Sequence, residues 1–139
     1  MIKKYLQIER KFDAAHKLEG YKGPCARLHG HTWKVVARFA YGRVGKVGIA
    51  ADFKELKVLV DKILPDHQYI NDWIKACGCK PIVMYQTMNP TAEVLSVLFY
   101  NMLKVRSTNK IRIVRVEVWE SEAACAIYEE EREVFPGWK

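Results

Sequence analysis

The chain has 139 residues and a mass of 16.1 kDa, a size that indicates one domain able to bury its own core. Half of the residues are hydrophobic and 28% are charged, which excludes a disordered or fibrous protein, and no apolar run reaches the roughly 20 residues of a membrane span. The net charge of +7 is concentrated in residues 1–46, which carry 11 basic and three acidic side chains. Such a region attracts anions, either nucleic acid or a small phosphorylated substrate.

The first part of the chain predicts three strands. Residues 2–12 are rich in β-branched and aromatic side chains and predict a strand, whereas residues 13–28 contain glycine and proline and predict a loop. The pattern is strand-like again over residues 29–41. Turn-forming residues at 42–45 then predict a hairpin that leads into a further strand at residues 46–51.

Two amphipathic helices are predicted next. Apolar residues recur at helical spacing over residues 52–64, and Asp52 is a suitable N-cap. A loop is expected over residues 66–88. Asn89 and Pro90 then resemble an N-cap followed by proline at the first position of a second helix, which runs to about residue 104.

Alternating residues predict two final strands at 111–119 and 124–128. No repeat and no linker divides the chain, so we expect residues 1–139 to form one domain. The element order predicts an α+β fold, with an antiparallel β-sheet and two helices packed on one face.

Three of the four histidines lie within 16 positions of one another. His29 and His31 flank Gly30 at the start of a predicted strand, where residues i and i+2 point to the same face. The loop before them is long enough to return His16 to this pair. Three neutral imidazoles with a vacant fourth position describe a catalytic zinc site, whereas a fourth protein ligand would describe a structural one. Ordinary surface or core histidines are the alternative.

The cysteines are too few and too irregularly spaced for a disulfide framework, so we expect free thiols. Cys25 could close a structural zinc site or act beside the metal as a thiolate base, which Lys22 and Arg27 would favour if they face it. Cys77 and Cys79, separated by one glycine, suggest a metal or redox pair but have no further ligands nearby; Cys125 suggests core packing.

Two further positions suggest acid–base chemistry or recognition. Asp66 directly precedes His67, and a carboxylate beside an imidazole can raise its pKa and select its tautomer. Val114, Val116 and Val118 are expected on one face of a strand, and Glu120 continues that face. The Glu120 carboxylate either reaches solvent or accepts paired N–H donors from a planar heterocycle.

Six motifs resemble, in order, those of the 6-pyruvoyltetrahydropterin synthase family over roughly residues 12–128. The matching segments are Phe12-Asp13-Ala14-Ala15-His16, Cys25-Ala26-Arg27-Leu28-His29-Gly30-His31, Gly48-Ile49-Ala50-Ala51-Asp52-Phe53-Lys54-Glu55-Leu56-Lys57, Leu64-Pro65-Asp66-His67-Gln68-Tyr69-Ile70-Asn71, Asn89-Pro90-Thr91-Ala92-Glu93, and Val118-Trp119-Glu120 followed by Tyr128. The Cys-x₃-His-Gly-His spacing is similar to the 6-carboxy-5,6,7,8-tetrahydropterin synthase branch, which makes a precursor of queuosine-type deazapurines.

The resemblance implies the tunnelling fold, in which subunits associate through their sheets into a β-barrel, as a trimer or a hexamer of two trimers, with sites shared between subunits. It implies a dihydropterin triphosphate substrate and a Zn(2+) cofactor. The implied roles are zinc ligands for His16, His29 and His31, proton acceptor for Cys25, proton relay for Asp66 and His67, pterin anchor and relay for Glu120, and pterin-pocket lining for Thr91 and Glu93.

The resemblance implies a lyase that releases acetaldehyde and triphosphate from 7,8-dihydroneopterin triphosphate. Residues 1–5 lack the apolar stretch of a secretory signal, so we expect a cytoplasmic protein. Two alternatives are the pyruvoyl branch and a non-enzymatic structural zinc module. Nucleic-acid binding would need exposed aromatics such as Tyr5, Tyr21 and Trp33 on a basic face, and no nucleic-acid motif is present, so we expect neither a nucleic-acid nor a membrane partner.

Overall fold

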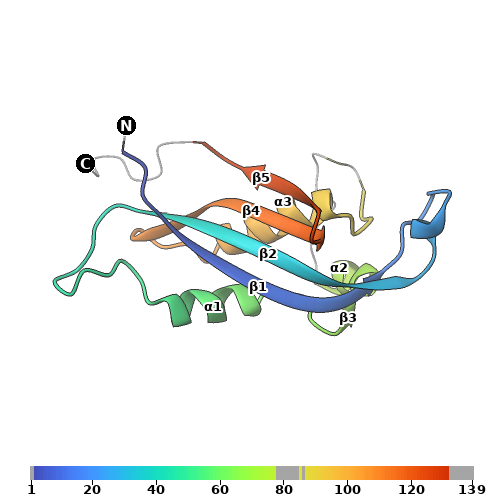
Figure 1. The fold of residues 1–139 in the computed structure, drawn as a ribbon, viewed down its shortest axis with the longest axis horizontal. Helices are drawn as coiled ribbons and strands as arrows, with labels where there is room; N and C mark the ends of the chain where they lie inside the picture. Colours follow the sequence, from blue (N-terminus) through green and yellow to red (C-terminus); the bar gives the residue numbers. More distant parts are fainter. Residues whose placement is uncertain (1, 78–84, 86, 132–139) are drawn as a thin grey trace.

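The computed structural model describes residues 2–77, 85 and 87–131, which form an α+β fold with one five-stranded sheet (Figure 1). The sheet order is β3-β1-β2-β4-β5. The elements are β1 (Tyr5–His16), η1, a 3₁₀ turn (Pro24–Ala26), β2 (His29–Tyr41), α1 (Phe53–Asp61), β3 (Gln68–Tyr69), α2 (Ile70–Ala76), α3 (Ala92–Lys104), β4 (Ile111–Ser121) and β5 (Ala124–Glu129).

The sheet is mixed and carries three helices, so the prediction of an antiparallel sheet with two helices was wrong in both respects. β3 pairs in parallel with β1, and α2 follows it directly, within the segment predicted to be a loop. A two-residue strand and a seven-residue helix are too short for hydrophobic periodicity to reveal. Their position depends on tertiary burial, since Ile70 and Ile74 are completely enclosed in the core.

β1 ends four residues later than predicted, because residues 13–16 continue the strand instead of forming a loop, and it begins three residues later, at Tyr5. These residues pair with the beginning of β2, up to the facing pair His16 and His29. The strand predicted at residues 46–51 is absent. β2 already has β1 and β4 as its two neighbours, so no edge remains for a hairpin partner. The strand at 29–41 is confirmed, and those at 111–119 and 124–128 are confirmed with short extensions.

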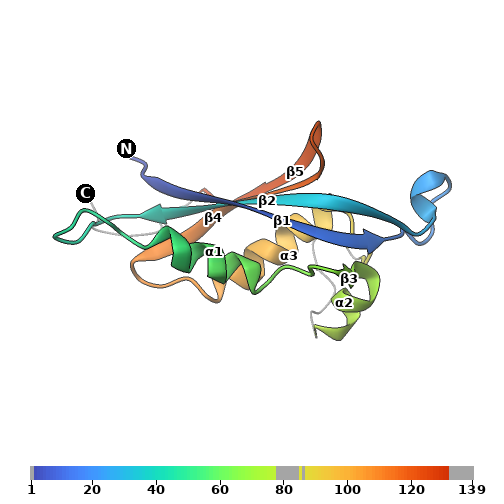
Figure 2. The ribbon, with the colours of Figure 1, turned by 60° about the horizontal axis from the view of Figure 1, so that its bottom comes forward.

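All three helices cover one face of the sheet (Figure 2). α1 packs against β1, and α3 packs against β4 and β5. Leu56 and Val60 of α1 and Leu95 and Phe99 of α3 are buried in the shared core. α1 begins after its predicted N-cap, Asp52, which accepts a hydrogen bond from the Lys54 amide. None of the helices in the described residues is long and apolar enough to cross a bilayer.

α3 begins two residues later than its predicted N-cap would require. Thr91 is the N-cap, and its hydroxyl accepts a hydrogen bond of 3.1 Å from the Val94 amide. Asn89 was predicted for this role, but its side chain binds the main chain of Glu19 instead. Threonine and asparagine are both good caps, so local chemistry could not decide between them.

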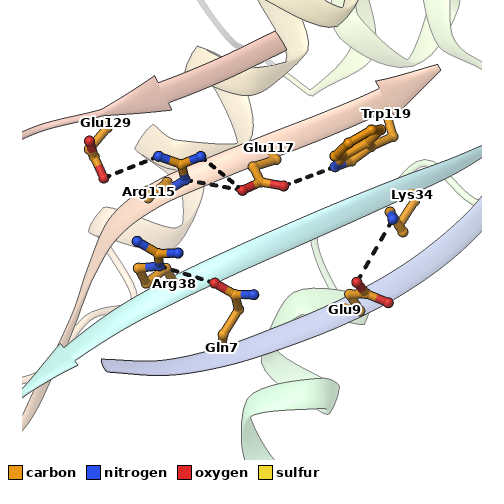
Figure 3. A network of polar contacts seen from close by, with 8 residues as sticks. All are labelled: Gln7, Glu9, Lys34, Arg38, Arg115, Glu117, Trp119 and Glu129. Atoms are coloured by element: carbon orange, nitrogen blue, oxygen red, sulfur yellow. Dashed lines mark hydrogen bonds and ion pairs between the residues drawn. The ribbon is translucent and has the colours of Figure 1, made fainter. Parts of the chain in front are cut away.

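The sheet face opposite the helices carries paired polar side chains (Figure 3). Arg115 contacts Glu117 at 3.0 Å, Glu117 accepts a hydrogen bond from the Trp119 ring, and Lys34 lies 4.4 Å from the centre of that ring. The pairing of β2 with β4 contains an irregularity just before Arg115, because Arg38 faces Arg115 whereas the next residue, Phe39, faces Ile113. The residue between them, Val114, is left out of the register with β2; it is buried, at 6% exposed, but is not part of the core cluster that includes Val116 and Val118.

Candidate metal centre

The three predicted histidine ligands come together at one end of β1 and β2. His16 faces His29 and Ala14 faces His31 in the strand register, so all three imidazoles lie on the same face of the sheet. Their ring centroids are 4.5, 4.8 and 5.2 Å apart, and one nitrogen from each lies within 4.8 Å of the others. The convergence expected from the sequence is confirmed, although strand pairing and not a returning loop delivers His16.

Main-chain carbonyls orient two of these rings. The Nδ1 of His16 donates to the Pro90 carbonyl at 2.7 Å, and the Nδ1 of His29 donates to the Arg27 carbonyl at 2.6 Å. A carbonyl can only accept, so each contact assigns the proton to Nδ1 and leaves the Nε2 lone pair available. The Nε2 atoms of His16 and His31 are buried and have no hydrogen-bond partner.

Burial disfavours the protonated form of two of these rings. The pKa of His16 is lowered from its ordinary value chiefly by burial, which outweighs the opposing effect of the hydrogen bond to Pro90. Burial also lowers the pKa of His31, against the attraction of Glu120. The Glu120 carboxylate lies 3.5 Å from Nε2 of His31. The two groups attract each other electrostatically but form no hydrogen bond.

This donor set fits a zinc ion. Three converging imidazoles, two of which donate Nδ1 to a carbonyl and so present Nε2, are typical of zinc sites with an open fourth position. Orphaned buried nitrogens are otherwise costly, and a cation would satisfy them. In the described residues, the group of metal-ligating atoms around His16 comprises the three histidines and does not include Cys25.

Trp33 lies against the histidine cluster, which corrects the sequence-based suggestion that it could be an exposed aromatic. Its ring is completely buried and packs edge-to-face against His16 at 4.8 Å and His31 at 5.2 Å. Its Nε1 donates to the Ala14 carbonyl. The alternation of β2 was a usable signal, because Trp33 follows His29 and His31 on the same face.

Cys25 lies in the segment between β1 and β2, which begins after His16 and ends at His29. It is at the centre of η1, it is half-buried, and it is a free thiol. Its carbonyl accepts a hydrogen bond from the Leu18 amide at 3.0 Å, which joins the two arms of the segment.

Asp66 and His67 form a second cluster with Asp13, separate from the three histidines. The Nδ1 of His67 lies 3.0 Å from Asp66, whose other oxygen accepts the Asp13 amide. This amide, followed by His67, lowers the pKa of Asp66 below its ordinary value. The His67 amide in turn donates to the Asp13 carbonyl, and His67 has a φ of 57°, an unusual conformation for a residue other than glycine.

A surface depression of about 610 Å³ runs along the ends of β1, β2 and β3. It is bordered by His31 of the first cluster and by Asp13 and His67 of the second. The side chain of His67 is 78% exposed there, so its remaining nitrogen is accessible.

Thr91 and Glu93 lie at the beginning of α3, shortly after Pro90, whose carbonyl accepts the hydrogen bond from His16. Thr91 is half-buried and its hydroxyl oxygen caps the helix, whereas Glu93 is exposed in the first turn. The hydrogen bond between His16 and Pro90 therefore connects the beginning of α3, which carries these two predicted residues, to the histidine cluster.

The remaining cysteines show no metal cluster within the described part of the chain. Cys77 donates a hydrogen bond to the Ile74 carbonyl, and Cys79 lies outside the described residues. Cys125 is half-buried on β5, and burial is the main cause that raises its pKa. This raised pKa favours the neutral thiol that packing suggests.

Comparison with known proteins agrees with this geometry. The sequence profile of 6-pyruvoyl tetrahydropterin synthase matches residues 5–131. The chain belongs to that family. The chain is 29% identical over 137 residues to the 6-carboxy-5,6,7,8-tetrahydropterin synthase of Haemophilus influenzae, with 88% of this chain and 96% of the relative covered. It is 33% identical over 112 residues to the protein of the same name from Rickettsia typhi, with 73% and 79% covered.

Solved structures share the fold. The 6-pyruvoyl tetrahydropterin synthase of Caenorhabditis elegans superposes with a TM-score of 0.70 at 20% identity, covering 94% of this chain and 98% of that one. The corresponding enzyme of Plasmodium vivax gives a TM-score of 0.63 at 21% identity, with 95% and 100% covered.

Proposed function

We propose that this protein is a zinc-dependent lyase that converts 7,8-dihydroneopterin triphosphate to 6-carboxy-5,6,7,8-tetrahydropterin, with release of acetaldehyde and triphosphate. The observation that carries the proposal is the convergence of three imidazoles, one nitrogen of each lying within 4.8 Å of the others, with Nε2 of His16 and His31 buried and without a hydrogen-bond partner. The names of the Haemophilus and Rickettsia relatives supply the pterin chemistry. The product would feed the synthesis of queuosine-type deazapurines.

His16, His29 and His31 would hold the zinc ion. When bound, zinc supplies Lewis acidity that polarises side-chain oxygens of the substrate and acidifies the adjacent C–H. The carbonyls of Pro90 and Arg27 keep two of these rings in the metal-binding tautomer before the ion arrives.

Cys25 is the proposed proton acceptor. As a thiolate it would remove the acidified proton, and its position outside the histidine group leaves its sulfur available for this role. His67 is the proposed second proton carrier. Asp66 accepts the Nδ1 proton of His67, so the other ring nitrogen would exchange protons while triphosphate leaves.

Glu120 is the proposed pterin anchor. A carboxylate accepts two parallel N–H donors, which is the pattern that an aminopyrimidinone ring presents. Its oxygen lies close to His31, so an anchored ring would have its side chain beside the metal centre. Thr91 and Glu93 would line the pocket from the beginning of α3, on the other side of His16.

We propose further that subunits associate through their sheets into a barrel, as a trimer or a pair of trimers, with sites shared between subunits. The high exposure of His67 beside the sheet edge supports this proposal, since a catalytic group is expected to be enclosed when substrate is bound. Co-expressed Cys25→Ala and His67→Ala chains test it. If Cys25 and His67 of one site come from different subunits, mixed oligomers contain some intact sites and recover activity. If both residues come from the same subunit, every site carries one substitution and the mixture stays inactive.

The function is tested by incubating zinc-loaded protein with 7,8-dihydroneopterin triphosphate and assaying acetaldehyde together with the pterin product. Equal amounts of acetaldehyde and 6-carboxytetrahydropterin are expected. Triphosphate release without acetaldehyde would assign the pyruvoyl branch instead. No turnover, combined with loss of the β-sheet signal when zinc is chelated, would assign a structural zinc module.

A further inference from the structure

Two asparagine side chains hold the main chain immediately after β1. Asn71 accepts the Lys17 amide at 3.0 Å and donates to the Lys17 carbonyl at 2.9 Å. Asn89 accepts the Glu19 amide at 3.0 Å and donates to the Glu19 carbonyl at 2.8 Å. Each carboxamide therefore satisfies both main-chain groups of one residue. The two residues held in this way, Lys17 and Glu19, are separated by one residue, Leu18.

This pattern requires an amide side chain. A carboxamide presents one acceptor and one donor, as a peptide group of a neighbouring strand does, whereas an ionised carboxylate presents acceptors only. Asn71 is only 5% exposed, so its bonds are shielded from water. Asn71 comes from α2 and Asn89 from the segment before α3, and together they continue the pairing of the chain past the end of β1.

The clamped residues connect two parts of the proposed catalytic site. Lys17 directly follows the zinc ligand His16. Leu18, between the two clamped residues, donates its amide to the carbonyl of Cys25. Restricting Lys17 and Glu19 therefore restricts the orientation of the Leu18 amide, and through it the main chain of Cys25.

We propose that Asn71 and Asn89 are positioning residues that hold Cys25 in register with the three histidines, by immobilising the chain between His16 and Cys25. The proposal rests on the proposed function for the role of Cys25 as proton acceptor. Neither asparagine acts on the substrate; each acts through main-chain hydrogen bonds to the segment. A misplacement of a catalytic group by about 1 Å can cost about 100-fold in rate, so this restraint matters for turnover.

The test replaces Asn89 with aspartate, which keeps the acceptor for Glu19 and removes the donor. We expect kcat to fall at least about tenfold, with KM within about twofold and zinc content unchanged. The alkylation rate of Cys25 by iodoacetamide, measured by peptide mass spectrometry with Cys125 as internal reference, should change at least about threefold. Asn71→Asp should act in the same direction.

Asn109→Asp is the matched control, because it makes the same chemical change at an exposed turn between α3 and β4. It should leave kcat and both alkylation rates unchanged. Wild-type values of kcat and Cys25 reactivity in Asn89→Asp would overturn the proposal. Loss of the β-sheet signal or of zinc in both clamp variants would also overturn it, because the asparagines would then be structural.

The alkylation measurement separates this proposal from the proposed function. If the wild-type protein fails to act on 7,8-dihydroneopterin triphosphate, the proposed function is wrong. The change in Cys25 reactivity between wild-type and Asn89→Asp protein still decides whether the clamp positions the thiol.

Discussion

Replacing His16 and His29 separately with alanine should distinguish a ligand that is also part of the core from one that is not. His16 is 1% exposed, bonds to the buried Pro90 carbonyl and packs against Trp33. His16→Ala leaves that carbonyl unpaired, at about 1–3 kcal/mol, and opens a cavity beside Trp33. The substitution also removes the buried Nε2 of His16, which has no hydrogen-bond partner, and this offsets part of the cost. We therefore expect the free energy of unfolding to fall by about 2–3 kcal/mol.

His29→Ala should cost less than about 1 kcal/mol, because its partner carbonyl belongs to the exposed Arg27 and water can replace the imidazole. For a chain of this length about 3–5 °C of thermal midpoint corresponds to each kcal/mol, so chelated His16→Ala should unfold about 10 °C below chelated wild-type protein, and chelated His29→Ala within about 4 °C of it.

The assay is thermal denaturation followed by circular dichroism at fixed protein concentration with excess chelator, together with zinc content measured by mass spectrometry after reconstitution. Both variants should lose bound zinc. Equal midpoints for the two chelated variants would refute the packing argument. A full equivalent of zinc retained by His29→Ala would refute the three-ligand centre.

Three further outcomes are expected. Cys25→Ala should abolish turnover while retaining a full equivalent of zinc, and loss of zinc in that variant would make Cys25 a ligand. The pKa values of His16 and His31 are lowered in the folded state, so the unfolded chain binds more protons as the pH falls through the ordinary histidine range. Urea denaturation of chelated protein should therefore show a lower free energy of unfolding at pH 5.5 than at pH 7.5; a constant value contradicts this. Thr91→Ala removes the hydrogen bond to Val94 and should cost about 1 kcal/mol by the same measurement, with Thr91→Ser close to wild type.

The histidine cluster was predictable because most of its information is local. The same-face placement of His29 and His31 follows from the two-residue period of a strand, and residues 29–41 are indeed a strand. His16 was correctly expected beside them but for the wrong reason, since residues 13–16 belong to β1 and not to a loop. The adjacency of Asp66 and His67 was likewise local, and their contact is present.

The contacts that orient these groups were not predictable. Pro90 is 74 residues from His16, and Asn71 and Asn89 are 54 and 70 residues from the main chain that they hold. Asn89 illustrates the difficulty, because beside a proline it has the pattern of an N-cap, and Thr91 satisfies the helix equally well. Only the packing of the segment before α3 against the segment after β1 decides between the two roles.

Residue order alone determined the strand and helix periods of the long elements, the candidate ligands and the family motifs, because each depends on neighbours within a few positions. The tertiary structure decided the length of β1, the existence of α2 and the mixed sheet, because each depends on burial and pairing with distant segments. It also decided the direction in which the pKa of His16 shifts, since that shift depends chiefly on the burial that the assembled core imposes.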